Sequence, residues 1–380
     1  MVAQRFWPRV GSLETRAGQL ACGLADCHVE VTIVTARWHS HWPTAIYYHG
    51  IPVVRLDHPP NGRWSMWRWS RSLARWTQRH ARQFDVICVW GLMHEAQTVV
   101  QAAGAQIPVV LVPERTGWHG DCFRQVQTLG GGVKSACLQA RAFVANSPAA
   151  RRELEAAGYP RERIFDVPIG VPRLPPRTYQ TQTEARALLA ESNLALQLAT
   201  HAPLVVSTSR LAVGRGWEQL LPAWSIVARQ KVAARLWLAG EAPAAAAIVR
   251  RIESLGLSGR VGLIGMFDDV EGLLAAADVH VAPPADGAPQ AIAEAMAAGV
   301  PSVAIDLPLN RWLLGDAAAG LLVPPENPAA FAAAISRLLD DSALATKLGA
   351  AAWQRAKTDF DLDKMVENYL QLFESMRATV

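Results

Sequence analysis

The chain has 380 residues, of which 51% are hydrophobic and 18% are charged, so wholesale disorder is excluded and two domains are expected. Its net charge of +4 is too small to indicate nucleic acid, and no nucleic-acid partner is expected. The five cysteines are odd in number and lack CxxC spacing, which argues against a disulfide framework or a zinc site: Cys22, Cys27, Cys88, Cys122 and Cys137.

Short apolar runs alternate with stretches rich in Ala and Leu along most of the chain. The runs mostly lack apolar–polar alternation, as is typical of parallel strands buried on both faces. Strands are expected at 29–35, 86–90, 109–112, 142–145, 204–208, 234–239, 261–264, 279–282 and 301–305, and helices at 13–25, 149–157, 218–229, 244–255, 269–276, 290–298 and 328–339. This order predicts an α/β fold with doubly wound parallel sheets.

Four prolines crowd the segment 168–176, and the βαβ rhythm restarts at Leu204. The sequence therefore predicts a linker there, between domains at 1–172 and 177–357. The tail 359–377 has the apolar spacing of a helix and is expected to cross back onto the first domain. Residues 1–176 hold 20 basic and 12 acidic residues, against 17 and 21 in 177–380, which indicates different partners for the two domains.

The scattered cysteines suit a reducing cytosol, so a cytoplasmic protein is expected, either free or peripheral on the inner face of the membrane. No apolar run reaches about 18 residues, so no transmembrane helix is expected. The residues from Met1 to Pro8 lack the apolar centre of a signal peptide. The segment from Arg63 to Phe84 contains six arginines, four tryptophans and no acidic residue. It reads either as an interfacial helix on an anionic membrane surface or as a solvated basic helix whose tryptophans pack on its own domain.

Loops at the carboxyl ends of parallel strands are where such sheets bind ligands. Gly11 and Ser12 precede the first helix and would let an anion approach its N-terminus, unless Ser12 is an ordinary N-cap. Arg210 and Arg215 lie in a glycine-bearing loop after the strand 204–208. They form either a clamp for a diphosphate or a pair of solvated surface arginines.

The most informative loop follows the strand 279–282. Asp286 lies in a Gly/Pro-rich turn, Pro289 opens a helix, and Glu294 follows eight positions after Asp286. Two carboxylates beside free helix N–H groups suit sugar and ribose hydroxyls. The alternative is a capping Asp with a solvated Glu.

These loops resemble, in order and spacing, those of glycosyltransferase family 4, the glycosyl transferases group 1. The resemblance is dense over about 200–340 and thinner before it, and it rests on Arg210, Arg215-Gly216, Ala239-Gly240, Gly265, Asp286-Gly287-x-Pro289, Glu294-Ala295-Met296-Ala297-x-Gly299-x-Pro301 and Gly320-Leu321-Leu322-Val323-Pro324-Pro325. It implies the GT-B fold, in which two Rossmann-like domains face a cleft, and a retaining, metal-independent glycosyltransferase.

The resemblance also implies a role for each matching residue. Arg210 and Arg215 would neutralise the diphosphate of a nucleotide sugar, Glu294 would bind its ribose, and Asp286 would hold the donor sugar. The remaining donor-binding residues would be Gly11, Ser12, Met266, Phe267, Gly287, Ala288, Pro289 and Gln290. The diphosphate itself would take the acceptor proton, so no catalytic base, metal or further cofactor is expected. The acceptor would be a glycan, a lipid-linked group or a small molecule.

Several positions depart from the family pattern. Arg215 stands where Lys is usual and Asp286 where Glu is usual, so charge is kept while geometry changes. Ser12 replaces a glycine, and Ile169 replaces a polar Asn. Cys88 and Trp90 occupy the stretch that often supplies a histidine, and the nearest histidine is His94.

These departures leave an alternative open. In it, the chain is a member of the family that binds a nucleotide sugar or a protein partner without catalysing transfer. The first strand is also expected to be a stub or cut short, because only six residues precede Trp7-Pro8. A nicotinamide oxidoreductase is disfavoured because the chain lacks the glycine fingerprint of a dinucleotide site.

Overall fold

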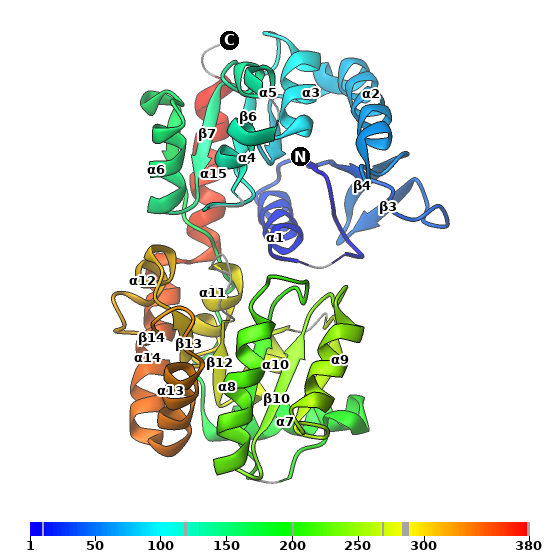
Figure 1. The fold of residues 1–380 in the computed structure, drawn as a ribbon. Coiled ribbons are helices and arrows are strands. Elements are labelled where there is room, and N and C mark those ends of the chain that lie inside the picture. The colour runs from blue at the N-terminus through cyan, green and yellow to red at the C-terminus, as the bar shows by residue number, and fades with distance from the viewer. Residues whose placement is uncertain are drawn as a thin grey trace. The chain divides into compact units, whose positions relative to one another are not determined.

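The computed structural model shows two α/β units (Figure 1). The structure describes residues 1–9, 11–117, 120–128, 130–199, 201–267, 270–282 and 289–377. The first unit comprises Met1–Arg9, Leu13–Gly170 and the segment that begins at Leu362, whereas Val171–Asp361 makes up almost all of the second. The C-terminal helix α15 (Leu362–Arg377) therefore belongs to the first unit.

The first unit contains an eight-stranded sheet in the order β3-β4-β2-β1-β5-β6-β7-β8. Only β3 is antiparallel to its neighbour, whereas all other pairs are parallel. The strands are β1 (Val2–Ala3), β2 (Ile33–Ala36), β3 (Ala45–Tyr48), β4 (Ile51–Leu56), β5 (Ile87–Trp90), β6 (Val109–Val112), β7 (Ala142–Ala145) and β8 (Ile164–Asp166).

Helices cover both faces of this sheet, and each face has its own apolar core. They are α1 (Ser12–Asp26), α2 (Arg63–His80), α3 (His94–Ala103), α4 (Asp121–Thr128), α5 (Gly130–Cys137) and α6 (Pro148–Ala156), with 3₁₀ turns η1 (Ala81–Gln83) and η2 (Arg161–Arg163). One core joins α2 and α3, and the other joins α1 and α15. A Cβ on Gly23 of α1 would lie 2.4 Å from Val366 Cγ2, so glycine permits the close approach of α15.

The second unit contains a six-stranded, fully parallel sheet in the order β11-β10-β9-β12-β13-β14. Its strands are β9 (Leu204–Thr208), β10 (Arg235–Ala239), β11 (Val261–Gly265), β12 (Val279–Val281), β13 (Ser302–Ile305) and β14 (Gly320–Val323). Its helices are α7 (Tyr179–Ser192), α8 (Trp217–Gln230), α9 (Ala245–Ser254), α10 (Val270–Ala276), α11 (Pro289–Ala297), α12 (Pro308–Leu314), α13 (Pro328–Asp340) and α14 (Ser342–Asp359), with the 3₁₀ turn η3 (Leu194–Leu196).

The structure confirms the predicted fold class of two parallel α/β sheets and corrects two elements. The strand expected at 29–35 begins only at Ile33. The tail helix does not run unbroken from 359, because α14 ends at Asp359 and α15 begins at Leu362. Asp361 interrupts the helix between them, where its buried carboxylate pairs with Arg173 and Val171 N–H donates to Phe360 O over 2.8 Å. No helix within the described ranges is long and apolar enough to cross a bilayer.

Candidate functional site

The centre of the second sheet is a topological switch point. The chain passes from β9 outward through β10 and β11, and then returns to place β12 on the other side of β9. The crevice outside the carboxyl ends of two such strands is the usual ligand site of a parallel α/β sheet. The loop carrying Arg210 and Arg215 follows β9, and the segment leading to α11 follows β12. β9 and β12, the strands that precede two of the predicted loops, therefore pair at the switch point.

The loop after β9 is held against the loop after β10. Ser209 N–H donates to Ala239 O over 3.0 Å, and Leu211 N–H donates to Glu241 O over 2.8 Å. Gly240 has a φ of +136°, and a Cβ there would lie 2.1 Å from Ser209 O. Only glycine therefore allows the backbone next to Arg210 to lie this close to the neighbouring turn.

Arg210 is already engaged in an ion pair. Its Nε lies 3.2 Å from Glu241 Oε2, and both side chains are partly exposed. A carboxylate thus holds the guanidinium at the carboxyl edge of β9 and β10. Sequence reasoning missed Glu241, although its position directly after Gly240, at the end of β10, was a signal.

The glycines beside Arg215 donate to a second carboxylate. Gly214 N–H and Gly216 N–H contact Glu218 Oε1 and Oε2 at 2.7 and 3.1 Å. Both glycines have positive φ, at +74° and +86°. Glu218 lies in the first turn of α8, where the helix dipole favours an anion. This end of α8 is therefore built to bind negative charge, and in this structure Glu218 supplies it.

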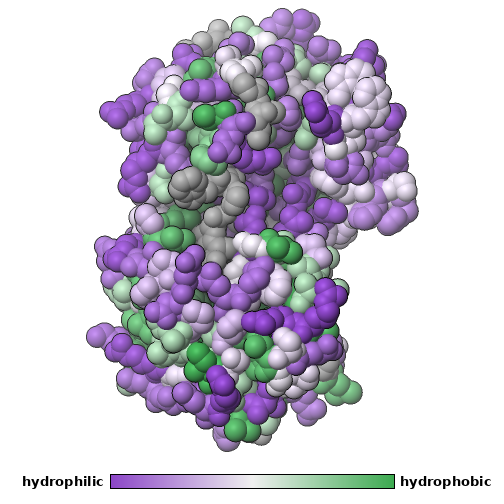
Figure 2. Space-filling view, in the orientation of Figure 1, coloured by the Kyte–Doolittle hydropathy of each residue, from purple (hydrophilic) through white to green (hydrophobic). Residues whose placement is uncertain are grey.

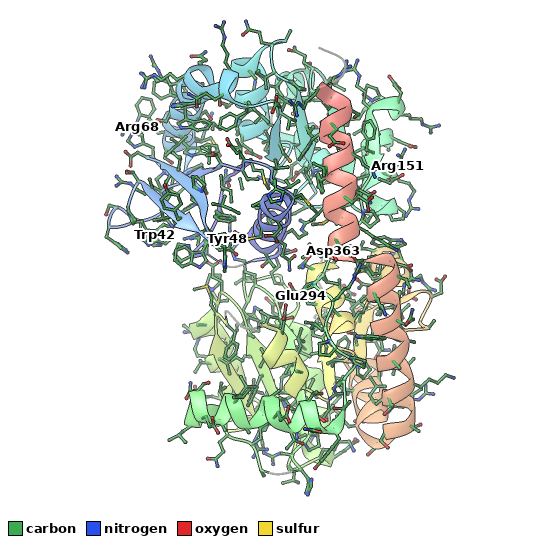
Figure 3. The ribbon with its side chains drawn as sticks, turned by 180° about the vertical axis from the view of Figure 1, so that it is seen from behind. Trp42, Tyr48, Arg68, Arg151, Glu294 and Asp363 are labelled. Atoms are coloured by element: carbon green, nitrogen blue, oxygen red, sulfur yellow. The ribbon has the colours of Figure 1, made fainter. Side chains whose placement is uncertain are left out.

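Glu294 lies on α11, the helix that follows β12 (Figure 3). Gln290 Nε2 donates to its Oε1 over 3.0 Å. Burial raises the pKa of Glu294 to about 7, and Glu271 adds to the rise while the Gln290 hydrogen bond opposes it. A half-buried carboxyl group whose charge changes near neutral pH is typical of a functional group rather than a solvated helix residue.

The other predicted donor-site residues have different outcomes. Pro289 opens α11 and Gln290 is buried, whereas Asp286, Gly287 and Ala288 lie outside the described residues. Met266 is exposed and Phe267 packs against the core, directly after β11. Ser12 begins α1 and Gly11 precedes it. The roles that the resemblance implies for all of these residues stay predictions.

β5 in the first unit carries a thiol and an indole rather than an imidazole. Cys88 and Trp90 are both 2% exposed and face an apolar core. Burial raises the pKa of the Cys88 thiol to about 12, so it is uncharged at neutral pH. His94 is the first residue of α3 and is only half-buried.

Two buried carboxyl groups that sequence reasoning missed organise this edge of the first sheet. Asp121 Oδ2 accepts N–H groups of Leu92 at 3.0 Å and Glu114 at 2.9 Å, and so joins the loops after β5 and β6. Burial raises the pKa of Asp121 to about 6, with Glu114 adding to the rise. Glu95 accepts Met93 N–H over 3.3 Å, and burial raises its pKa to about 8.

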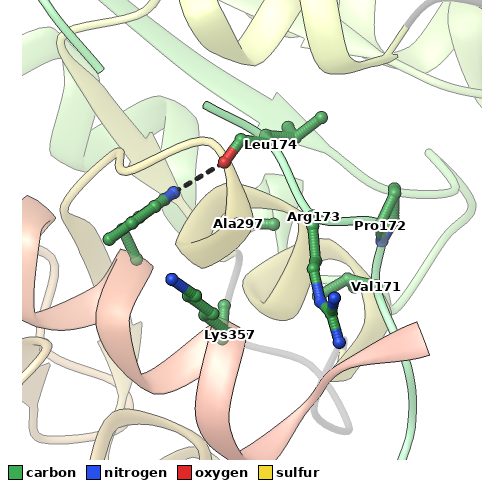
Figure 4. A pocket seen from close by; sticks show the side chains of 8 residues that line it. Val171, Pro172, Arg173, Leu174, Ala297 and Lys357 are labelled. Carbon is green, nitrogen blue, oxygen red and sulfur yellow. Dashed lines mark hydrogen bonds between the residues drawn. The ribbon is translucent and has the colours of Figure 1, made fainter. Parts of the chain in front are cut away.

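The second unit also contains a small, mainly apolar cavity of about 170 Å³ (Figure 4). It lies where the linker passes α14, and Trp353 Nε1 donates to Leu174 O across one side. It touches α11 at Ala297, at the end of that helix opposite to Pro289. This cavity is therefore separate from the switch point. Its lining residues are Val171, Pro172, Arg173, Leu174, Ala297, Trp353, Ala356 and Lys357.

No group of three or more His, Cys, Asp or Glu side chains within the described residues is placed to hold a metal ion.

Comparison with known families matches both halves of the chain. The model for a glycosyl transferase 4-like domain matches residues 11–170, and the model for glycosyl transferases group 1 matches residues 202–341. The chain belongs to the group 1 glycosyltransferases. The resemblance inferred from the loops is thereby confirmed.

This group 1 glycosyltransferase is similar to two kinds of curated relative. It is 28% identical over 234 residues to the lipopolysaccharide core biosynthesis glycosyltransferase LpsE of Rhizobium meliloti, covering 61% of this chain and 64% of LpsE. It is 32% identical over 133 residues to a phosphatidyl-myo-inositol mannosyltransferase of Mycobacterium leprae, covering 34% of this chain and 35% of that protein. The matched region thus spans less than two thirds of either relative.

Solved structures establish the GT-B fold of the glycosyltransferase. Sucrose-phosphate synthase from Thermosynechococcus elongatus has a TM-score of 0.81 at 22% identity, covering 98% of this chain and 95% of that one. Anabaena Alr3699/HepE in complex with UDP-glucose has a TM-score of 0.76 at 20% identity, covering 98% of both chains. At this identity the likeness shows the fold alone, and the predicted GT-B architecture is confirmed.

Proposed function

We propose that the chain moves a sugar from a nucleotide-diphosphate sugar to a hydroxyl acceptor, with retention of configuration and without a metal ion. The observation that supports this proposal is that β9, which Arg210 and Arg215 follow, pairs at the switch point with β12, the strand before the helix that carries Glu294. Cations on one segment and a carboxyl group on the other match a ligand that carries a diphosphate and a ribose.

The chemistry requires positive charge at the leaving group. As the bond to the anomeric carbon breaks, negative charge grows on the diphosphate and the sugar becomes oxocarbenium-like. Preorganised donors aimed at such charge contribute about 2.7–4 kcal/mol each in other enzymes. Arg210 and Arg215 would supply that charge, and the diphosphate would displace Glu241 from Arg210. The acceptor oxygen would bond to the anomeric carbon on the face that the diphosphate leaves, which gives retention without an enzyme nucleophile. The departing diphosphate would take the proton of the acceptor hydroxyl.

The relatives narrow the substrates to be tested. HepE, which shares the fold, has been solved with UDP-glucose, so a uridine donor is the first candidate and guanosine donors are the second. LpsE is named for lipopolysaccharide core biosynthesis, which favours a glycan or lipid-linked acceptor over a small metabolite.

Nucleotide binding should depend on pH through Glu294. The ionised carboxylate accepts ribose hydroxyls better than the protonated acid, and its pKa is raised to about 7. Affinity for a nucleoside diphosphate should therefore rise between pH 6 and pH 8 by about tenfold at most, because the ionised fraction of a group with a pKa of about 7 rises from about a tenth to about nine-tenths over that range. Isothermal titration calorimetry with UDP and GDP at several pH values measures it.

The matched control for this titration is Glu294→Gln. The ligand phosphates titrate identically against both proteins, so the difference between the two curves isolates Glu294. The variant should bind more weakly at pH 8 and lose the extra pH dependence. Parallel curves for wild type and variant would exclude Glu294 from ribose binding.

A second candidate function is binding without transfer. Cys88 and Trp90 place a buried thiol and an indole where the family often has a histidine, and this observation favours it. A transferase and a nucleotide-sugar-binding protein both predict nucleotide binding by calorimetry, whereas a chain that binds only a protein partner predicts none. Only a transferase also cleaves the donor, so a donor-turnover assay separates them.

A further inference from the structure

The solvent-exposed positions on the outward face of α2 are two tryptophans, four arginines and Gln78. At about 100° per residue, the six aromatic and cationic side chains among them fall within about 120° of the helix circumference. We call this set the α2 face: Trp64, Trp67, Arg68, Arg71, Arg75 and Arg79. All six are exposed, whereas Trp69 and Leu73 on the opposite side are fully buried in the core shared with α3.

The α2 face is strongly cationic and unneutralised. The segment 63–84 holds no acidic residue. None of the four arginines of the face forms an ion pair with another residue in the described part of the chain, and Arg71 lies over the ring of Trp67 at 5.3 Å. Figure 2 shows this part of the surface in purple and near-white, and Figure 3 labels Arg68 at the rim of the first unit.

The two tryptophans make this face different from a solvated basic helix. Trp64 is 71% exposed and Trp67 is 50% exposed, and their rings stack at 5.1 Å. They lie at the N-terminal end of α2, at the carboxyl edge of the sheet, because α2 follows β4 directly. Indole rings prefer the headgroup level of a bilayer, and arginines pair with lipid phosphates. Two large aromatic rings would otherwise stay in water beside four cations.

We propose that the α2 face docks on a lipid bilayer that contains anionic lipids. Trp64 and Trp67 enter the headgroup region, and Arg68, Arg71, Arg75 and Arg79 bind lipid phosphates. This goes beyond the proposed sugar transfer and does not depend on it. If both hold, docking brings the carboxyl edge of the first sheet close to a membrane, which suits a lipid-linked acceptor.

Sedimentation with vesicles tests the docking. The full chain is mixed with vesicles of phosphatidylcholine alone, or of phosphatidylcholine with phosphatidylglycerol in about equal parts. We expect it to pellet only with the anionic vesicles, and to be released at about 1 M salt, where the screening length is about 3 Å. A chain that stays in the supernatant at low salt would overturn the proposal.

Three variants test whether vesicle binding depends on the α2 face itself or only on the net charge of the chain. Arg71→Gln/Arg75→Gln/Arg79→Gln should weaken vesicle binding about a hundredfold, at roughly fivefold per arginine near an anionic surface. Trp64→Ser/Trp67→Ser should weaken it at least tenfold while keeping every charge. The charge-matched control removes three exposed arginines of the second unit, Arg229, Arg250 and Arg251.

The control variant should pellet nearly as well as wild type. If the control and the Arg71/Arg75/Arg79 variant lost vesicle binding equally, net charge alone would explain the binding. That result would contradict the proposal. Unchanged melting in each variant excludes unfolding as the cause. If a duplex oligonucleotide bound more tightly than vesicles and the Trp64/Trp67 variant bound both as wild type does, the face would be a nucleic-acid surface, and the proposal would be wrong.

Discussion

Replacing Arg210 by Ala should lower donor turnover at least a hundredfold while leaving the fold intact. The side chain is partly exposed and forms an ion pair with Glu241, so its loss removes little packing. In the proposed reaction the guanidinium faces negative charge that grows as the diphosphate leaves, and one such preorganised donor is worth about 2.7–4 kcal/mol. Release of nucleoside diphosphate from the donor, measured at saturating donor, reports the loss.

Two further variants test whether a loss of turnover in Arg210→Ala comes from the guanidinium of Arg210 itself. Glu241→Gln frees Arg210 from its partner, so donor affinity should stay equal or rise. Arg229→Ala removes an exposed cation at the far end of α8 and should change turnover less than twofold. If Arg210→Ala kept near wild-type turnover, the guanidinium clamp would be rejected.

Replacing Gly240 by Ala should cause the largest loss of stability. The new Cβ would lie 2.1 Å from Ser209 O, and the φ of +136° is strained for any residue with a Cβ. Strain of about 1–3 kcal/mol and overpacking of about 1–3 kcal/mol together cost on the order of 4 kcal/mol. The apparent melting temperature should therefore fall by about 10 °C, as measured by circular dichroism.

Gly256→Ala is the matched control for Gly240→Ala. Gly256 also has a positive φ, +66°, but a Cβ there would meet nothing within 4 Å. It should therefore show the backbone strain alone, about 1 kcal/mol. Equal melting temperatures for the two variants would mean that the contact between Gly240 and Ser209 does not constrain the loop that carries Arg210.

The local sequence predicts the bounds of the strands that are buried on both faces. Strands such as β6, β7 and β9 match their predicted bounds because each is a continuous apolar run buried on both faces. β4 was missed because its side chains alternate between buried and exposed positions, whereas β1, with two residues, is the stub that the short segment before Trp7-Pro8 led us to expect. The break between α14 and α15 was missed because Asp361 is held there by Arg173, a partner 188 residues away.

The candidate site was predictable only in part for the same reason. Arg210, Arg215 and Glu294 stand out by residue type and by position after a strand. Their carboxylate neighbours do not, because Glu241 reaches Arg210 from a different strand–helix loop. Asp121 likewise joins two loops through backbone N–H groups, and no side-chain pattern reveals such bonds.

Mass-spectrometric screening of the purified chain against a panel of uridine and guanosine sugar nucleotides tests the central claim most directly. We expect the wild type to cleave one donor into nucleoside diphosphate and sugar, and the Arg210→Ala variant to leave that donor almost intact. Nucleoside diphosphate binding without cleavage of any donor in the panel, with or without glycan and lipid-linked acceptors, would contradict sugar transfer and leave a binding protein in its place.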